Sequence, residues 1–156
     1  MKPDSPFRCL LALVTALLCN PVTLTSAADG QWRSVAGPVA ARIVRIIDGD
    51  TLVVEAHPWP GHSVRVSVRL RGIDTPERRS QCADQRAAAR LARNELERLV
   101  RDFPTVELIN VSGGKYYGRV LADMKAGTRD VAAAMLASGL ARPYDGGKRH
   151  KPQCAG

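Results

Sequence analysis

Aromatic residues are scarce in this sequence, and the patterns that identify several classes of protein are missing from it. Phe, Trp and Tyr make up 4% of the 156 residues, so the core has to be built from aliphatic side chains. No apolar run approaches the roughly 20 residues that a membrane-spanning helix needs. No segment repeats at a period of about 20–50 residues, which excludes a solenoid. No cluster of His and Cys has the spacing of a zinc site, so zinc is not expected.

Negative charge is also in short supply. The chain has 23 Lys and Arg residues against 15 Asp and Glu residues, a formal net charge of +8 at pH 7. Hydrophobic residues make up 45% of the sequence, which is too many for a disordered basic protein and is ordinary for a folded domain. A positive field attracts polyanions, of which nucleic acid is the commonest large one, but charge alone does not identify the partner.

The N-terminal residues have the pattern of a secretory signal peptide. Lys2 and Arg8 precede an apolar stretch that runs from Cys9 to Cys19, and small residues follow it. We therefore expect residues 1–27 to be a signal peptide and the protein to be secreted or periplasmic, without stable membrane association after cleavage. An uncleaved membrane anchor is the alternative.

The rest of the chain predicts one domain between two irregular segments. Residues 28–38 contain Gly, Ser and Pro without periodicity and are expected to be a flexible lead-in. The folded domain is expected over residues 39–145, followed by a basic tail rich in Gly and Pro over residues 146–156. Nothing in the sequence indicates oligomerisation, so we expect a monomer.

Two cysteines remain after the leader, Cys82 and Cys154. An even pair in an exported chain favours a disulfide. Such a bond would close a loop of about 70 residues and stabilise the fold by roughly 4 kcal/mol in the loop-entropy model. Because spacing along the chain does not show that the two thiols meet, two free thiols are the alternative.

Apolar periodicity predicts five strands and two helices. One strand is marked by apolar residues at every second position from Val64 to Leu70, with arginines on its other face. An apolar stripe predicts a helix over 84–101, with Asp84 as its N-cap. That stripe consists of Ala88, Leu91, Ala92, Leu96, Leu99 and Val100. A second helix is expected over 129–138, begun by Thr128 and closed by Gly139.

The order of these elements points to a small barrel. The other strands are expected over 39–47, 51–56, 105–111 and 119–125, so that three strands, a helix, two strands and a helix follow one another. This order predicts an α+β, mainly β fold: a five-stranded OB-fold Greek-key barrel with two helices.

Charged residues concentrate at three turns or strand ends: Asp48–Thr51, Arg69–Glu77 and Tyr116–Arg119. Asp50 and Asp74 lie on separate turns and are candidates to converge on one hard cation, since oxygen ligands suit Ca²⁺ or Mg²⁺. Taken singly, each segment is more typical of an ordinary turn, such as a type I′ hairpin at Asp48–Thr51, or of a solvated arginine face. Their combination favours a site.

On these residues the sequence resembles the staphylococcal nuclease (thermonuclease) family. Four strings occur in the family's order and cover about residues 40–145: Ile47–Thr51, Arg69–Glu77, Tyr117–Ala122 and Gly139–Ala141. The resemblance implies a calcium-dependent phosphodiesterase on an OB-fold. It further implies that DNA and RNA are both cut, with little sequence specificity, and that the products end in 3′-phosphate.

The resemblance also implies a role for each matched residue. Asp50 and Asp74 match the carboxylates that bind the metal, and Thr75 matches the residue that offers its backbone carbonyl. Asp48 matches a nearby acid that supports them. The catalytic residues implied are Glu77, which activates or orients the attacking water, and the phosphate-binding arginines Arg69 and Arg119.

Other matches concern the substrate and the tail. Tyr117 matches a tyrosine near the bound nucleotide, and Tyr144 lies close to one that stacks on the base; packing at the barrel rim is the alternative for both. The family's lysine before the first tyrosine is replaced here, and Lys115 is the candidate to substitute for it. The staphylococcal enzyme's C-terminal helix has no counterpart, and we expect Cys154 to pin the tail in its place.

Two classes of function stay open at this point. The first is the nuclease that the matched residues imply. The alternative is a non-catalytic OB-fold module that binds nucleic acid or protein, for which loss of the matched Asp, Glu or Arg residues would be typical; here all of them are present. A structural OB-fold protein of the envelope is a third, weaker possibility.

Overall fold

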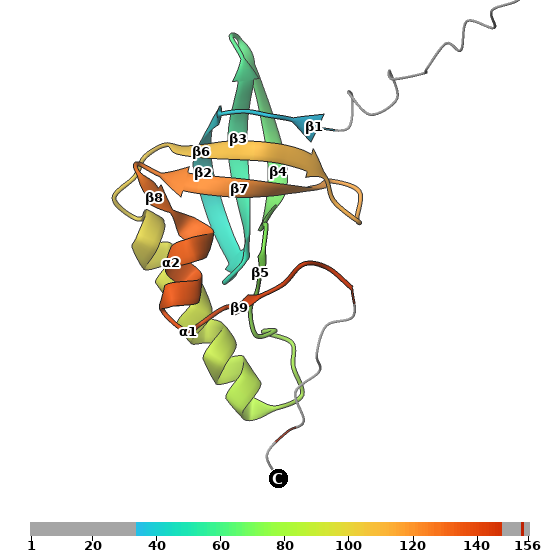
Figure 1. Cartoon of the computed structure of the whole chain (residues 1–156), viewed down its shortest axis with the longest axis vertical. Coiled ribbons are helices and arrows are strands. Elements are labelled where there is room, and N and C mark those ends of the chain that lie inside the picture. The colour runs from blue at the N-terminus through green and yellow to red at the C-terminus, as the bar shows by residue number, and fades with distance from the viewer. Residues whose placement is uncertain (1–33, 148–153, 155–156) are drawn as a thin grey trace, which may run out of the picture.

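The computed structural model describes residues 34–147 and 154, so the predicted signal peptide lies outside the described residues. Five long strands form a closed barrel, with two helices at one end of it (Figure 1). These strands are β2 Val39–Asp48, β3 Thr51–Trp59, β4 His62–Leu70, β6 Val106–Gly113 and β7 Arg119–Ala126. The prediction of a mainly β, five-stranded OB-fold barrel with two helices is confirmed.

Strand pairing shows how the barrel closes. β2, β3 and β4 form an antiparallel meander, β4 pairs with β7 in parallel, and β6 pairs with both β7 and β2. Each strand of this ring therefore has a partner on both sides, which leaves the barrel without an open edge. The parallel β4–β7 pair, Ser67 opposite Arg119, brings together two segments about fifty residues apart in sequence.

Four two-residue strands complete the fold: β1 Ser34–Val35 and β8 Arg129–Asp130 add to the barrel sheet, and β5 Ile73–Asp74 and β9 Arg142–Pro143 form a separate two-stranded sheet. β1 pairs with β6, so the prediction of an irregular lead-in over 28–38 is wrong at Ser34 and Val35. Two residues are too few for sequence periodicity to show, and β6 supplies the pairing. β5 pairs with β9, which draws the C-terminal segment back to the residues that follow β4.

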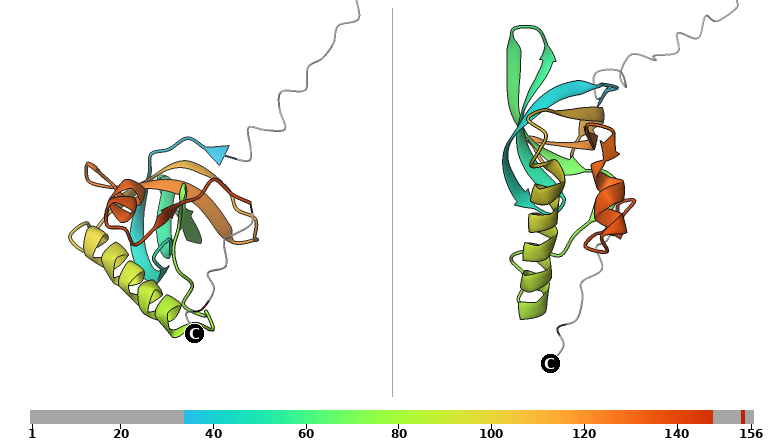
Figure 2. Two further views of the ribbon diagram at one scale, coloured as in Figure 1. Left: turned by 60° about the horizontal axis from the view of Figure 1, so that its bottom comes forward. Right: turned by 90° about the vertical axis from the view of Figure 1, so that its left-hand side faces the viewer.

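The core is aliphatic, as the low aromatic content predicts. Among the described residues, the fully buried side chains include Leu52, Leu70, Leu96, Leu108 and Met124, and no aromatic side chain is fully buried. Within β4, Val68 and Leu70 are buried but Val64 is 47% exposed, because the β3–β4 hairpin projects beyond the barrel away from the helices (Figure 2).

α1 (Ala83–Val100) packs against the barrel through four of the six residues of the predicted stripe, and Ala88 and Leu91 are not among its buried residues. Ala89, Ala92, Leu96, Leu99 and Val100 are buried, whereas Leu91 is 58% exposed. A straight helix turns about 100° per residue, so the face set by Ala92 and Leu96 leaves Leu91 pointing outward. The N-cap is Cys82 rather than Asp84, and no side chain hydrogen-bonds there.

α2 (Val131–Ala137) begins later than predicted. Its N-cap is Asp130, whose side chain accepts a hydrogen bond from the backbone N–H of Ala133, and not Thr128. Gly139 follows the helix with φ of +71°, as predicted for a residue that ends it in the left-handed region.

Cys82 and Cys154 form a disulfide, with Cα atoms 5.3 Å apart, which confirms the predicted pairing. The bond joins the start of α1 to the C-terminal tail, 72 residues away in sequence. No helix among the described residues is long and apolar enough to cross a membrane.

Candidate active site

The turn between β2 and β3 places the first carboxylate of the site. Asp48 ends β2, Thr51 begins β3, and the two are paired across the turn as the hairpin prediction requires. Gly49 has no positive φ, so the turn is not the type I′ turn considered from the sequence. Glycine is needed for space: a Cβ there would lie 2.6 Å from Ala92 Cβ and 3.0 Å from Thr75 Cγ2. The turn is therefore seated directly on α1 and the Thr75 loop.

Asp50 is a buried carboxylate, with 2% of its surface exposed. Its Oδ1 atom accepts a hydrogen bond from Thr51 Oγ1 at 2.7 Å and forms an ion pair with the Arg69 guanidinium. Its Oδ2 atom accepts from the backbone N–H and the hydroxyl of Thr75, at 3.0 and 2.8 Å. A buried charge is costly unless it is paired and hydrogen-bonded, and Asp50 is both.

Arg69 joins the two acidic turns. It lies on β4 with 8% of its surface exposed, so the solvated arginine face considered from the sequence does not describe it. One terminal nitrogen binds Asp50, and the other donates to Asp74 Oδ1 at 2.7 Å and to the carbonyl of Ile73 at 3.1 Å. Asp50 and Asp74, from separate turns, thus converge on a single cationic group.

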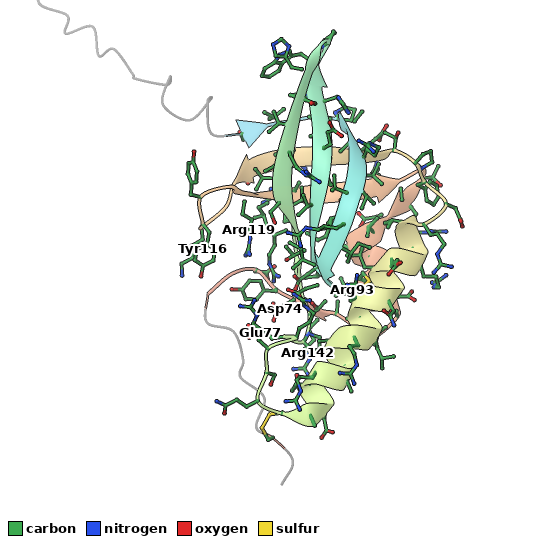
Figure 3. The ribbon with its side chains drawn as sticks, turned by 180° about the vertical axis from the view of Figure 1, so that it is seen from behind. Asp74, Glu77, Arg93, Tyr116, Arg119 and Arg142 are labelled. Atoms are coloured by element: carbon green, nitrogen blue, oxygen red, sulfur yellow. A yellow bond between two sulfur atoms is a disulfide. The ribbon has the colours of Figure 1, made fainter. Side chains whose placement is uncertain are left out.

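Beside this cluster lies a pocket of about 270 Å³, the active-site pocket. The polar side chains that line it are those of Asp48, Asp50, Thr51, Arg69, Thr75, Glu77, Arg78, Arg79 and Arg119. Glu77 comes from the loop after β5, and Arg119 from the start of β7. Figure 3 shows Arg119 and Glu77 on the same side of the barrel. Three of the four predicted acids, Asp48, Asp50 and Glu77, therefore share one hollow with both arginines, and the fourth acid, Asp74, binds Arg69.

The loop that carries Glu77 is held to the β2–β3 turn. Arg78 Nε donates to Asp48 Oδ1 at 2.6 Å, and both residues line the pocket. Asp48 therefore positions the loop rather than binding Arg69. Arg78 and Arg79 also add two cationic groups to the pocket lining.

The model of the staphylococcal nuclease homologue family matches residues 67–154, more than half of the chain. The chain belongs to the staphylococcal nuclease homologue family. A search of curated proteins finds no match to it. The family assignment confirms the resemblance that the four sequence strings carry, and it makes nucleic acid the substrate class that the family implies.

Calcium dependence is general in this family, and the donor atoms here fit calcium in kind. Asp50 and Asp74 already direct oxygen atoms at one positive charge, that of Arg69. Among residues 34–147 and Cys154, no group of three or more His, Cys, Asp or Glu side chains is placed to hold a metal ion. The Thr75 carbonyl and water would therefore have to complete the shell, and these are ligands that Ca²⁺ accepts.

Of the two tyrosines that the resemblance implies, Tyr144 lies at the site and Tyr117 does not. Tyr144 lies with its ring 6.0 Å from the Arg69 guanidinium, brought there by the β5–β9 pairing and a backbone bond to Gly72. Tyr117, in contrast, is fully exposed and does not line the pocket. It is Tyr116, which the sequence comparison treats only as a replaced lysine, whose ring lies 5.3 Å from the Arg119 guanidinium.

Lys115 lies beside Tyr116 rather than in the active-site pocket. Its ammonium is 5.8 Å from the Tyr116 ring, and Lys115 is not among the residues that line the hollow. Tyr116 therefore has two cationic neighbours, Lys115 and Arg119. The sequence shows two adjacent tyrosines, Tyr116 and Tyr117, but does not show which of them lies beside Arg119. Only the tertiary contact identifies Tyr116.

Proposed function

We propose that this protein is an exported, calcium-dependent nuclease that hydrolyses phosphodiester bonds of DNA, RNA or both with little sequence specificity and leaves 3′-phosphate ends. The observation that carries the proposal is the shared pocket of Asp50, Arg69, Glu77 and Arg119. It combines a carboxylate, which can take a proton, with two guanidinium groups, which can neutralise a phosphate. These are the groups that hydrolysis of a phosphodiester requires.

In the proposed reaction, Glu77 orients a water molecule and accepts its proton as the water oxygen bonds to phosphorus. The bond from phosphorus to the 5′-oxygen breaks, the 5′-oxygen takes up a proton, and the phosphate stays on the 3′-oxygen. Arg69 and Arg119 donate to the phosphate oxygens on which negative charge builds up. Asp50, Asp74 and the Thr75 carbonyl would hold Ca²⁺, which would supply further positive charge to the site.

The buried contacts of Arg69 support its proposed catalytic role. Its guanidinium is held by Asp50, Asp74 and the Ile73 carbonyl, so its orientation is set before substrate arrives. A preorganised cation loses little entropy when charge develops beside it. Arginines contact phosphates rather than base edges, which supports low sequence specificity.

Digestion with and without calcium tests the proposal directly. Plasmid DNA and total RNA are incubated with the protein released after removal of residues 1–27, first in Ca²⁺ and then in EGTA. We expect degradation in Ca²⁺ only, with fragments that need phosphatase treatment before a 3′-end can be extended. Tight binding of DNA without any cleavage would contradict the nuclease and support the binding module.

Substitution of Glu77 by Gln keeps the shape of the side chain but removes the base. We expect turnover to fall by at least about 100-fold, the scale of losing an acid–base group, while circular dichroism shows the fold intact. An unchanged rate would refute the role of Glu77.

Two further measurements test the predicted signal peptide and the predicted monomer. N-terminal sequencing of the exported protein shows whether residues 1–27 have been removed. The mass of the protein in solution shows whether it is a monomer.

A further inference from the structure

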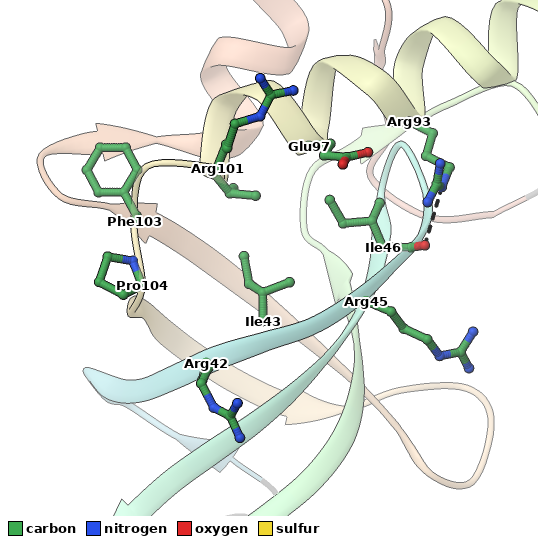
Figure 4. Close-up of a pocket in the computed structure, with 10 residues that line it drawn as sticks. Arg42, Ile43, Arg45, Ile46, Arg93, Glu97, Arg101, Phe103 and Pro104 are labelled. Atoms are coloured by element: carbon green, nitrogen blue, oxygen red, sulfur yellow. Dashed lines mark hydrogen bonds between the residues drawn. The ribbon is translucent and has the colours of Figure 1, made fainter.

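A second and larger hollow lies between α1 and β2, outside the site described above. This α1–β2 pocket has a volume of about 520 Å³. Apolar side chains and arginines line it together, and Figure 4 shows the exposed side chains of Arg45 and Arg101 pointing outward from it. Figure 4 shows Ile43 and Ile46 rising from β2 towards α1, with Phe103 at one end and Arg93 at the other.

The lining carries four arginines and a single acid, Glu97. Arg42 is already engaged, because it pairs with Glu55 and lowers the pKa of that carboxyl through a hydrogen bond and direct charge attraction. Arg93 donates to the Ile46 carbonyl at 3.4 Å. No hydrogen bond or ion pair joins the side chains of Arg45 and Arg101 to another described residue.

An anionic ligand with a flat apolar part suits such a hollow. Guanidinium groups bind phosphate oxygens, and the apolar side chains of Ile43, Ile46 and Phe103 can accept the face of a base. A nucleotide unit combines both features. Carboxylates line the active-site pocket but only Glu97 faces this one, so the α1–β2 pocket is suited to holding a phosphate, not to cleaving next to it.

The two pockets are neighbours along one strand. Arg45 and Ile46 line the α1–β2 pocket, and the next two residues of β2, Ile47 and Asp48, line the active-site pocket. Consecutive strand residues are about 3.3 Å apart. Because the two linings adjoin along β2, the occupant that we consider for both is a polymer that carries a phosphate in every unit.

We propose that the α1–β2 pocket is an accessory site that binds a flanking, single-stranded segment of the nucleic acid whose scissile bond lies in the active-site pocket. The inference rests on the proposed nuclease function, and it adds a length preference to it. Substrates long enough to reach Arg45 and Arg101 are bound more tightly than substrates that fill the active-site pocket alone.

The test compares two double variants in the full processed protein. Arg45→Gln with Arg101→Gln removes two charges from the α1–β2 pocket. Arg65→Gln with Lys125→Gln removes two charges from exposed positions that line neither pocket, and so is the matched control. Binding of a labelled 16-nucleotide single strand is followed by fluorescence anisotropy in EDTA, and cleavage of this strand and of a dinucleotide is followed in Ca²⁺.

We expect the pocket variant to bind the 16-nucleotide strand at least about tenfold more weakly, the scale of losing a charge-assisted hydrogen bond. The salt dependence of binding should also become less steep by about 1.4, the value for two lost phosphate contacts on a single strand. Cleavage of the dinucleotide should be unchanged, and the control variant should change each value less than about twofold.

Each other outcome has a distinct meaning. Equal weakening in both double variants would overturn the inference, since only overall charge would then matter. If the pocket variant binds DNA as well as the unaltered protein does, the inference is overturned. If that variant also loses binding to phosphatidylglycerol vesicles, the pocket binds a membrane surface instead. Weakened binding of the strand by a protein that cleaves nothing would refute the nuclease and leave the accessory site standing.

Discussion

The two pockets use arginine in opposite ways. In the active-site pocket Arg69 is buried and held by two carboxylates, whereas in the α1–β2 pocket Arg45 and Arg101 stand exposed beside apolar side chains. A buried, fixed cation stabilises charge at one point, and an exposed, mobile one attracts a polyanion over a wider area. The comparison indicates that partner and burial, more than residue type, decide what each arginine does.

The largest expected difference between the pockets is in stability. Arg69→Gln leaves the buried carboxylate of Asp50 without its cation and should lower the free energy of unfolding by roughly 3–5 kcal/mol. Arg45→Gln, in the other pocket, should change it by less than about 0.5 kcal/mol. Urea denaturation in EDTA measures both. If both substitutions change the free energy of unfolding equally, the burial of Arg69 does not make it more important for stability than the exposed Arg45.

A second prediction separates catalysis from stability within the active-site pocket. Arg119 is only half-buried, so Arg119→Ala should leave the unfolding midpoint nearly unchanged. Turnover should nevertheless fall by about 100-fold, because a group that stabilises the transition state is lost. Lys125→Ala, an exposed change on the same strand, is the control and should keep full turnover. A variant at Arg119 with normal turnover would remove this residue from the mechanism.

The smallest effect is expected at the turn that seats Asp50. In Gly49→Ala the new Cβ would meet Ala92 Cβ at 2.6 Å, and relief of this clash should cost about 1–3 kcal/mol. Gly113→Ala is the matched control, since nothing lies within 4 Å of its added Cβ. If thermal unfolding shows equal midpoints for both variants, the close packing of the turn on α1 is not what positions Asp50.

Many residues of the active-site pocket could be predicted from the sequence because they lie in short, continuous motifs. Asp50, Arg69, Glu77 and Arg119 stand in strings of five to nine residues whose order along the chain carries the resemblance. The structure brings them to one pocket. What no string shows is that Arg69 is buried, because its partners come from turns on either side of β4.

Two of the errors, at Leu91 and at Tyr117, share a cause. Leu91 fits an apolar stripe by spacing, yet it faces outward because Ala92 sets the contact with the β2–β3 turn. Tyr117 matches a family position, but Tyr116 is the tyrosine beside Arg119. In each case adjacent residues are alike in sequence, and only the packing partner distinguishes them.

The sequence by itself determined the aliphatic core, the succession of strands and helices, the cysteine pair and the charged residues of the active-site pocket. These follow from neighbours two to four positions apart, or from residue types that a given chemistry demands. Closure of the barrel decided the burial of Arg69, the added strand at Ser34–Val35 and the α1–β2 pocket. Those features depend on segments distant along the chain, whose contacts form only when the strands pair and the helix docks.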